Sequence, residues 1–263
     1  MTHTKKNGGL TKAATGIQGF DDITGGGVPQ GRTTLVMGGP GSGKTVFALQ
    51  SLVAGAREGE PGILVTFQES PRQLAENAAS FGWDIAELEK DKLVILDSRI
   101  RPNAFKSIQL YLSGMLAGIR VVANEMGAKR IAFDGIDTLF SLLGDRMNER
   151  HEIFRLRDWL LESGLTSIIT AQVDGHDLSV FQRHGFMQFM ADCVVNLNHQ
   201  LTGPEIGRSL RVVKYRGSSF VERELPLAIG PDGIRAGSSK RPKALAGIQQ
   251  EITASQASFQ ARI

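Results

Sequence analysis

The chain has one cysteine, no long hydrophobic run and few aromatic residues. A single cysteine, Cys193, excludes an internal disulfide and a cysteine-rich zinc module. No stretch of about 18 apolar residues occurs, which excludes a membrane-spanning helix. The first seven residues hold no apolar stretch, so we expect no signal peptide. We therefore expect a cytoplasmic protein that makes no membrane contact.

A strong charge of either sign is also lacking. The chain has 30 basic and 27 acidic side chains, and most of the basic excess lies near its two ends. Residues 10–236 hold 24 basic and 26 acidic side chains, a net charge of −2. This balance does not favour a nucleic-acid-binding body. The five histidines show no metal-ligand spacing, which excludes a histidine zinc site. Cys193 begins an apolar run and is interpreted as a buried small hydrophobe.

Apolar runs alternate with helical patterns along most of the chain. Short, β-branched, nearly continuous apolar runs predict buried strands. They lie at 34–37, 63–67, 93–96, 131–133, 167–170, 194–197 and 210–215. Helical patterns lie at 44–57, 71–81, 104–126, 149–163 and 185–191. This alternation predicts an α/β fold with a mostly parallel central sheet flanked by helices. Residues 225–229 and 233–235 are expected to form a C-terminal β-hairpin.

Four segments differ in composition. Residues 1–9 are expected to be a flexible leader, and residues 10–236 the folded domain. Residues 237–247 are rich in Gly, Ser, Lys, Pro and Ala, as linkers are. Residues 248–263 are expected to form either a polar tail or a short helix. In the helix, Ile252, Phe259 and Ile263 would share one face. Such a tail could recruit a regulatory protein.

The strongest motif is a glycine-rich loop after the first apolar strand. Residues 38–45 read GGPGSGKT, which matches G-x-x-x-x-G-K-[ST], and a helical pattern follows. Backbone N–H groups of such a loop surround phosphate oxygens, and the helix N-terminus adds positive partial charge. Lys44 would neutralise the β- and γ-phosphates, and the Thr45 hydroxyl would bind Mg²⁺. The predicted ligand is ATP, bound by Gly39, Gly41, Ser42, Gly43, Lys44, Thr45 and Val46.

Two carboxylates follow apolar strands and complete this prediction. Asp134 ends the run 131–133, where a buried strand would place it beside the Mg²⁺. Asp137 is expected to cap a helix or to face solvent. Gln68 and Glu69 end the run 63–67, close to where a water-activating carboxylate is needed. Glu69 is either that base or only part of the cap of the next helix.

The chain resembles the RecA-like P-loop ATPases and, within them, the KaiC family. The resemblance rests on the run 15–22, the glycines Gly25, Gly26, Gly27 and Gly31, and the stretches 65–70, 80–84 and 214–219, and it covers about residues 12–236. It implies a homo-oligomeric ring, usually a hexamer, with ATP between subunits. Lys214 and Arg216 would reach the neighbour's γ-phosphate. Tyr215, Ser218 and Phe220 would also contact the nucleotide, and Ser80 would lie near the base.

The strand pattern supports the pairing of the two cations. Positions 214 and 216 project from the same face of a strand, with Tyr215 on the opposite face. Two cations two residues apart can hold one phosphate. Without the resemblance, a solvated basic strand face would explain the same residues.

The chain departs from the family at two places. The family's first of two adjacent glutamates is Gln68 here, and an amide can orient a water but cannot accept its proton. We therefore expect slow hydrolysis. Some family members phosphorylate themselves on adjacent Ser and Thr before an Asp, but the matching stretch 185–192 has no hydroxyl. Self-phosphorylation there is not expected.

Three functions follow from these residues. The first is a Mg²⁺-dependent ATPase whose turnover changes the shape of a ring. The second is an ATP-gated scaffold with little turnover, which Gln68 favours. The third is a RecA-like ATPase acting on DNA, against which stand the −2 net charge and the acidic loop 173–177.

Overall fold

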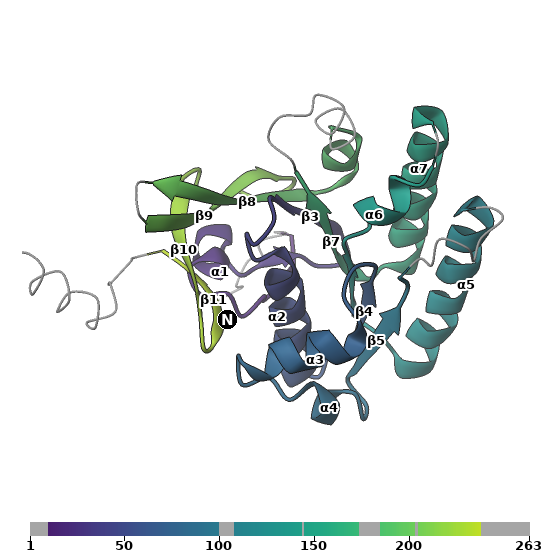
Figure 1. Cartoon of the computed structure of the whole chain (residues 1–263), viewed down its shortest axis with the longest axis horizontal. Helices are drawn as coiled ribbons and strands as arrows, with labels where there is room; N and C mark the ends of the chain where they lie inside the picture. Colours follow the sequence, from purple (N-terminus) through teal and green to yellow (C-terminus); the bar gives the residue numbers. More distant parts are fainter. Residues whose placement is uncertain (1–9, 100–107, 144, 174–184, 203–204, 238–263) are drawn as a thin grey trace, which may run out of the picture.

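A nine-stranded sheet forms the centre of the molecule (Figure 1). This computed structural model describes residues 10–99, 108–143, 145–173, 185–202 and 205–237. The strands are β1 (Lys12–Ala13), β2 (Val28–Pro29), β3 (Thr33–Gly38), β4 (Gly62–Thr66), β5 (Leu93–Asp97), β6 (Arg130–Asp134), β7 (Thr166–Gln172), β8 (Cys193–Thr202), β9 (Glu205–Tyr215), β10 (Glu224–Gly230) and β11 (Gly233–Ala236). The main sheet has the order β11-β10-β9-β8-β3-β7-β6-β4-β5, and β1 pairs separately with β2.

The direction of the strands confirms the mostly parallel sheet predicted from the sequence. The six strands from β8 to β5 run parallel to one another. Strands β9, β10 and β11 are antiparallel to their neighbours. The expected C-terminal hairpin is β10–β11, which closes through a turn at residues 231–232.

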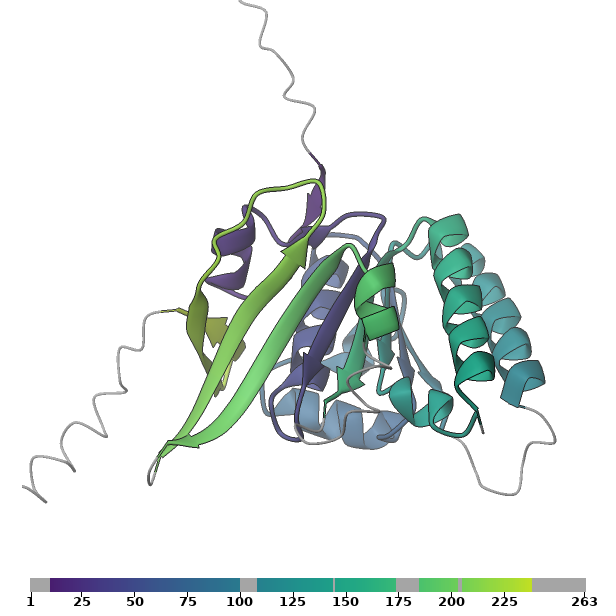
Figure 2. The ribbon, with the colours of Figure 1, turned by 90° about the horizontal axis from the view of Figure 1, so that it is seen from above.

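Helices cover both faces of the sheet (Figures 1 and 2). They are α1 (Phe20–Thr24), α2 (Lys44–Arg57), α3 (Pro71–Ala79), α4 (Ile85–Leu88), α5 (Ile108–Met126), α6 (Asp137–Phe140) and α7 (Arg146–Ser163). Residues 185–190 form another short helix. The predicted span of α2 is confirmed, whereas α3 ends two residues earlier than predicted and α7 begins three residues earlier. No helix in the described ranges is both long and apolar enough to cross a bilayer.

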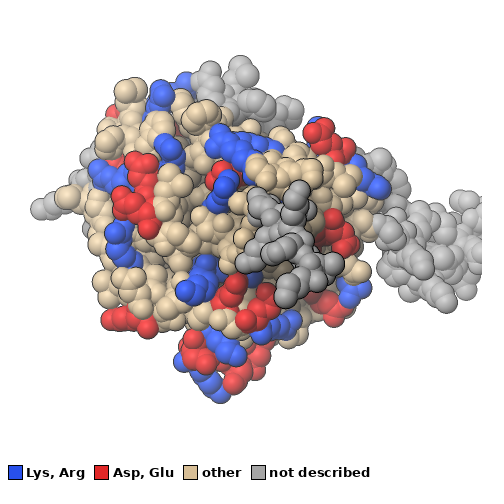
Figure 3. Space-filling model, turned by 180° about the vertical axis from the view of Figure 1, so that it is seen from behind, with Lys and Arg blue, Asp and Glu red and all other residues tan. Residues whose placement is uncertain are grey.

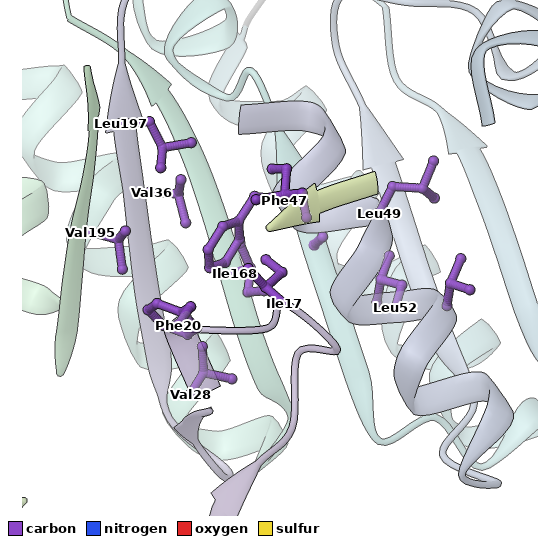
Figure 4. Close-up of a cluster of buried hydrophobic side chains, with 14 of the residues drawn as sticks. Ile17, Phe20, Val28, Val36, Phe47, Leu49, Leu52, Ile168, Val195 and Leu197 are labelled. Atoms are coloured by element: carbon purple, nitrogen blue, oxygen red, sulfur yellow. The ribbon is translucent and has the colours of Figure 1, made fainter. Parts of the chain in front are cut away.

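Alternation along the buried strands divides the core into two clusters. Val36 of β3 faces α2 and the N-terminal segment, where Phe47, Phe20 and Ile17 are fully buried (Figure 4). Leu35 and Met37 of the same strand face α5, α6 and α7 instead. A strand buried on both faces needs apolar residues at consecutive positions, which explains the continuous apolar runs.

A buried arginine anchors the start of β6. Arg130 is only 2% exposed, and its guanidinium forms an ion pair with Glu60 at 2.6 Å. It also donates hydrogen bonds to the carbonyl oxygens of Ala14 and Ser51, at 2.6 and 2.9 Å. Arg130 therefore joins β6 to α2 and to the N-terminal segment. A charge this deeply buried is tolerated because each of these partners compensates its lost hydration.

Several expectations lie outside the described residues. They are the leader at 1–9, the tail at 238–263, the beginning of the helix predicted from residue 104, and the acidic loop from 174 onward.

Cys193 is fully buried, and burial raises the pKa of its thiol to about 12. The interpretation of Cys193 as a buried hydrophobe is confirmed.

Candidate functional site

The glycine-rich loop joins the carboxyl end of β3 to the first residue of α2. Gly43 has φ +101°, a conformation that residues with a side chain rarely adopt. A Cβ at this position would also lie 2.9 Å from Ile229 Cδ1 of β10. The Lys44 ammonium donates hydrogen bonds to the carbonyl oxygens of Gly38 and Gly39, at 2.8 and 2.9 Å. The ammonium thus lies within the loop, beside the N-terminus of α2, where a phosphate group would be bound.

Two other predicted binding residues, Ser42 and Val46, lie in the loop and in the first turn of α2. The Ser42 N–H points toward Gly39 O at 3.3 Å, and the Ser42 side chain is buried. Val46, in the first turn of α2, packs against the first core cluster. Its side chain therefore helps to hold the helix N-terminus against the sheet.

Strand β6 delivers Asp134 to the loop. The Thr45 hydroxyl donates to Asp134 Oδ2 at 2.9 Å, and the Thr170 hydroxyl of β7 donates to Asp134 Oδ1 at 2.7 Å. Burial raises the pKa of the Asp134 carboxyl, while these hydroxyls and the Lys44 ammonium oppose the rise. Oxygen ligands of this kind suit Mg²⁺, which binds one or two protein oxygens together with phosphate oxygens. Thr45 and Asp134 therefore fit a magnesium site.

Glu69 follows β4 and lies on the same edge of the sheet. Its Oε2 accepts a hydrogen bond from Asn77 Nδ2 at 2.9 Å. Burial and the negative charge of Asp134 raise the pKa of the Glu69 carboxyl, and the Asn77 hydrogen bond opposes them. Helix α3 is capped by Ser70, whose hydroxyl oxygen accepts from the Gln73 N–H. The cap therefore does not need the Glu69 side chain.

Gln68 points in another direction. Its amide Nε2 donates to the Thr138 hydroxyl at 3.1 Å, beside α6. The side chain also lies against Gly135, where a Cβ would be 2.7 Å from Gln68 Cδ. Asp137 is the first residue of α6, and no side-chain cap bond is formed there.

Lys214 and Arg216 donate to neighbouring carbonyl oxygens, although only Lys214 lies in β9 and Arg216 is in the turn directly after the strand. The Lys214 ammonium donates to Gln188 O at 2.7 Å, and the Arg216 guanidinium donates to Phe189 O at 3.0 Å. Burial and the charge of Arg216 lower the pKa of Lys214. Tyr215 is buried on the opposite face, where its hydroxyl donates to Gly27 O at 3.0 Å.

Strand register separates these two cations from the chain's own loop. Tyr215 pairs with Cys193 of β8, which pairs with Thr34 near the start of β3. The loop begins after Gly38, four residues farther along β3. At about 3.3 Å per residue the two groups are roughly 13 Å apart along the strands. Lys44, Thr45, Glu69 and Asp134 thus form one group, and Lys214 and Arg216 form another.

Three weaker candidates make contacts of their own. Ser80 follows α3 and donates its hydroxyl hydrogen to Asn77 O at 2.6 Å. Ser218 is three residues beyond β9 and donates to Ser219 O at 2.9 Å. Phe220 packs near Tyr215, with 6.4 Å between the ring centroids.

The sequence reading missed Thr170 and Asn77. Thr170 ends the apolar run of β7, and the rule that singled out Asp134 at the end of a neighbouring parallel strand would have found it. Asn77 has no comparable signal, because a polar residue on an exposed helix face is ordinary.

Comparisons with known proteins match most of this chain to one family. A family model for the KaiC ATPase domain matches residues 13–241. The circadian clock protein KaiC2 of Synechocystis sp. is 39% identical over 237 residues, which are 89% of this chain and 41% of that protein. The circadian clock oscillator protein KaiC of Parasynechococcus marenigrum is 40% identical over 229 residues, 86% of this chain and 44% of that protein. The chain thus spans less than half the length of these relatives.

A solved structure is similar over its whole length. The crystal structure of a KaiC-like protein from the archaeon Pyrococcus horikoshii OT3 aligns with a TM-score of 0.76 and 35% sequence identity. The alignment covers 87% of this chain and all of that chain.

Proposed function

Because the chain belongs to the KaiC family of ATPases, we propose that it binds ATP with Mg²⁺ and hydrolyses it slowly between the subunits of a ring. The meeting of Thr45, Asp134 and Glu69 beside the phosphate loop carries this proposal. The turnover would change the shape or the assembly of the ring. We propose that this ring is a hexamer, which the family resemblance supports.

Each residue of the first group has a distinct role. Lys44 exchanges the loop carbonyls for phosphate oxygens and balances their charge. Thr45 and Asp134 hold the Mg²⁺, which would screen the phosphate charges when bound. Thr170 orients Asp134 from the neighbouring strand. Residues 38–46 supply the backbone N–H groups that enclose the phosphates.

Glu69 is proposed as the base that accepts a proton from the attacking water. Its raised pKa moves the carboxyl toward neutral pH, where a general base is most effective. Asn77 holds one carboxylate oxygen and leaves the other for the water. Gln68 supplies no second base, which is the reason for slow turnover.

Lys214 and Arg216 are proposed to act on the neighbouring subunit. Their separation from their own loop supports this, since a cation must lie within a few ångströms of the phosphate it stabilises. Within one chain they hold the carbonyls of the helix at 185–190, which a neighbour's phosphate would replace. Arginine and lysine at this place would stabilise the charge of the transferred phosphoryl group.

The first test is steady-state ATP hydrolysis with Mg²⁺, with Lys44→Ala as the blank. Turnover above the blank that is lost in Glu69→Gln supports the proposal. Tight ATP binding without turnover would refute hydrolysis. It would favour the second candidate, an ATP-gated scaffold. The supporting observation is that residue 68 is an amide, held by the Thr138 hydroxyl, and supplies no base for hydrolysis.

The second test concerns action between subunits. Arg216→Ala and Lys44→Ala are each expected to be inactive alone. In an equal mixture, about one site in four would combine an intact loop with an intact neighbouring arginine, because a head-to-tail interface pairs different patches. An Arg216→Ala protein that is fully active by itself would refute this role.

A DNA-acting ATPase is not favoured. On the face shown in Figure 3, basic and acidic side chains are interspersed over the described residues. Nucleic-acid interfaces are instead strongly positive.

A further inference from the structure

The hairpin of β8 and β9 extends past the sheet to the phosphate loop. His199 of β8 and Arg208 of β9 stand opposite each other in the strand register. The Arg208 Nε donates a hydrogen bond to Gly41 O at 3.1 Å. His199 Nδ1 lies 3.3 Å from Pro40 O. A carbonyl oxygen only accepts, so the His199 ring must carry its proton on Nδ1 in this contact.

These two contacts hold consecutive peptide groups of the loop. A trans peptide group is planar, so its C=O and the next N–H point in opposite directions. Holding Pro40 O toward the hairpin turns the Gly41 N–H away from it. Holding Gly41 O does the same for the Ser42 N–H.

The direction in which the Ser42 N–H points is known from its own contact. It points toward Gly39 O, at 3.3 Å. The Lys44 ammonium donates to this same carbonyl oxygen. The Ser42 N–H and the Lys44 ammonium therefore face the same interior of the loop. An anion bound in this interior would accept hydrogen bonds from both groups, as anions do in other backbone nests.

We propose that Arg208 and His199 are positioning residues for nucleotide binding, which fix two peptide groups of the phosphate loop so that their N–H groups face the phosphates of a nucleoside di- or triphosphate. This inference rests on the proposed ATP site. It assigns to the hairpin a role within its own subunit, distinct from that of Lys214 and Arg216. Because these donors are already held in place, less conformational entropy is lost when the nucleotide binds.

The choice of an arginine and a histidine suits this role. Both contacts are to backbone oxygens of the loop, so they do not depend on the side chains of residues 40 and 41. The Arg208 hydrogen bond is charge-assisted, and such bonds are stronger than neutral ones. Arg208→Ala should therefore have a larger effect than His199→Ala.

The test measures the Kd of MgADP by calorimetry on the full chain. ADP has no γ-phosphate, so its affinity does not depend on Lys214 and Arg216. Arg208→Ala should weaken binding by about tenfold, the lower end of the loss expected for one hydrogen bond to a charged group, and His199→Ala by about two- to fivefold. Arg208→Lys, which keeps a donor, should restore part of the loss.

Arg211→Ala is the matched control. Arg211 lies on the same strand, is exposed, and pairs with Asn196 and Glu224. Its replacement removes the same charge without touching the loop contacts described above, and the Kd should stay within about twofold of wild type. The melting temperature without ligand gives a second readout. The Arg208→Ala and His199→Ala variants should keep the wild-type melting temperature, while the increase produced by MgADP should shrink.

Two outcomes would overturn the inference. One is a Kd for Arg208→Ala and His199→Ala equal to that of wild type. The other is an equal loss in Arg211→Ala, which would make the effect one of general charge. If the wild-type chain binds MgADP and hydrolyses ATP while the variants bind as well as wild type, only the positioning role of Arg208 and His199 is refuted. A wild-type chain that binds no MgADP refutes the proposed function as well.

Discussion

Replacing Arg130 with alanine should strongly destabilise the protein. The guanidinium is almost fully buried and has an ion pair with Glu60 and two hydrogen bonds to backbone carbonyls. Removing one partner of a buried ion pair costs about 3–5 kcal/mol, because the remaining groups lose their compensation. For a domain of this size each kcal/mol lowers the melting temperature by about 2–4 °C, so we expect a decrease of about 6–20 °C.

The assay is thermal unfolding without nucleotide at a fixed protein concentration. Arg235→Ala is the matched control, because Arg235 forms an ion pair with Asp232 in which both side chains are more than 60% exposed. Exposed pairs contribute about 0–1 kcal/mol, so this variant should melt close to wild type. If both variants melt within a degree or two of each other, the structural argument for Arg130 is wrong.

Three further predictions concern the site itself. Asp134→Asn should abolish turnover yet raise the melting temperature at pH 7.5, because burial raises the pKa of Asp134 and the ionised carboxyl therefore costs stability. This gain should vanish as the pH falls below the ordinary pKa of 3.8, where the carboxyl is protonated in both the folded and the unfolded chain. An equal gain at all pH values would contradict the prediction. Gln68→Glu should increase kcat about three- to tenfold, because a carboxylate can accept a proton and the amide cannot; an unchanged kcat in steady-state assays would refute this. Gly135→Ala should cost about 1–2 kcal/mol in denaturant unfolding, since Gly135 has φ +76° and its new Cβ would meet Gln68; a wild-type midpoint would show that the turn relaxes.

The sequence predicts most of the sheet because each buried strand is a continuous apolar run. Residues 131–133 and 167–170, for example, lie within β6 and β7. The phosphate loop and Asp134 were predictable for the same reason, since their positions follow from the strands before them. The short elements α1, α4 and α6 were not predicted, because four or five residues cannot show a helical period.

The extent of the β8–β9 hairpin was also not predictable. Its outer half is mostly polar, with Leu201 and Ile206 as its only large apolar residues, so the apolar runs at 194–197 and 210–215 mark only its inner half. The contacts of His199 and Arg208 with the loop depend on this outer half. They join residues about 160 positions apart, and neither residue type indicates such a contact without the fold.

Strand β9 touches both places at which this chain is proposed to meet nucleotide. Arg208 lies near its start and contacts the chain's own loop, while Lys214 lies near its end. They are six positions apart along the strand, about 20 Å, and a hydrogen-bonded strand neither stretches nor shortens appreciably. In a ring, any shift of the loop that moves β9 along its axis would move the cations presented to the next subunit by the same amount. Cooperativity between successive sites would then need no additional domain, because one inextensible strand links each site to the next.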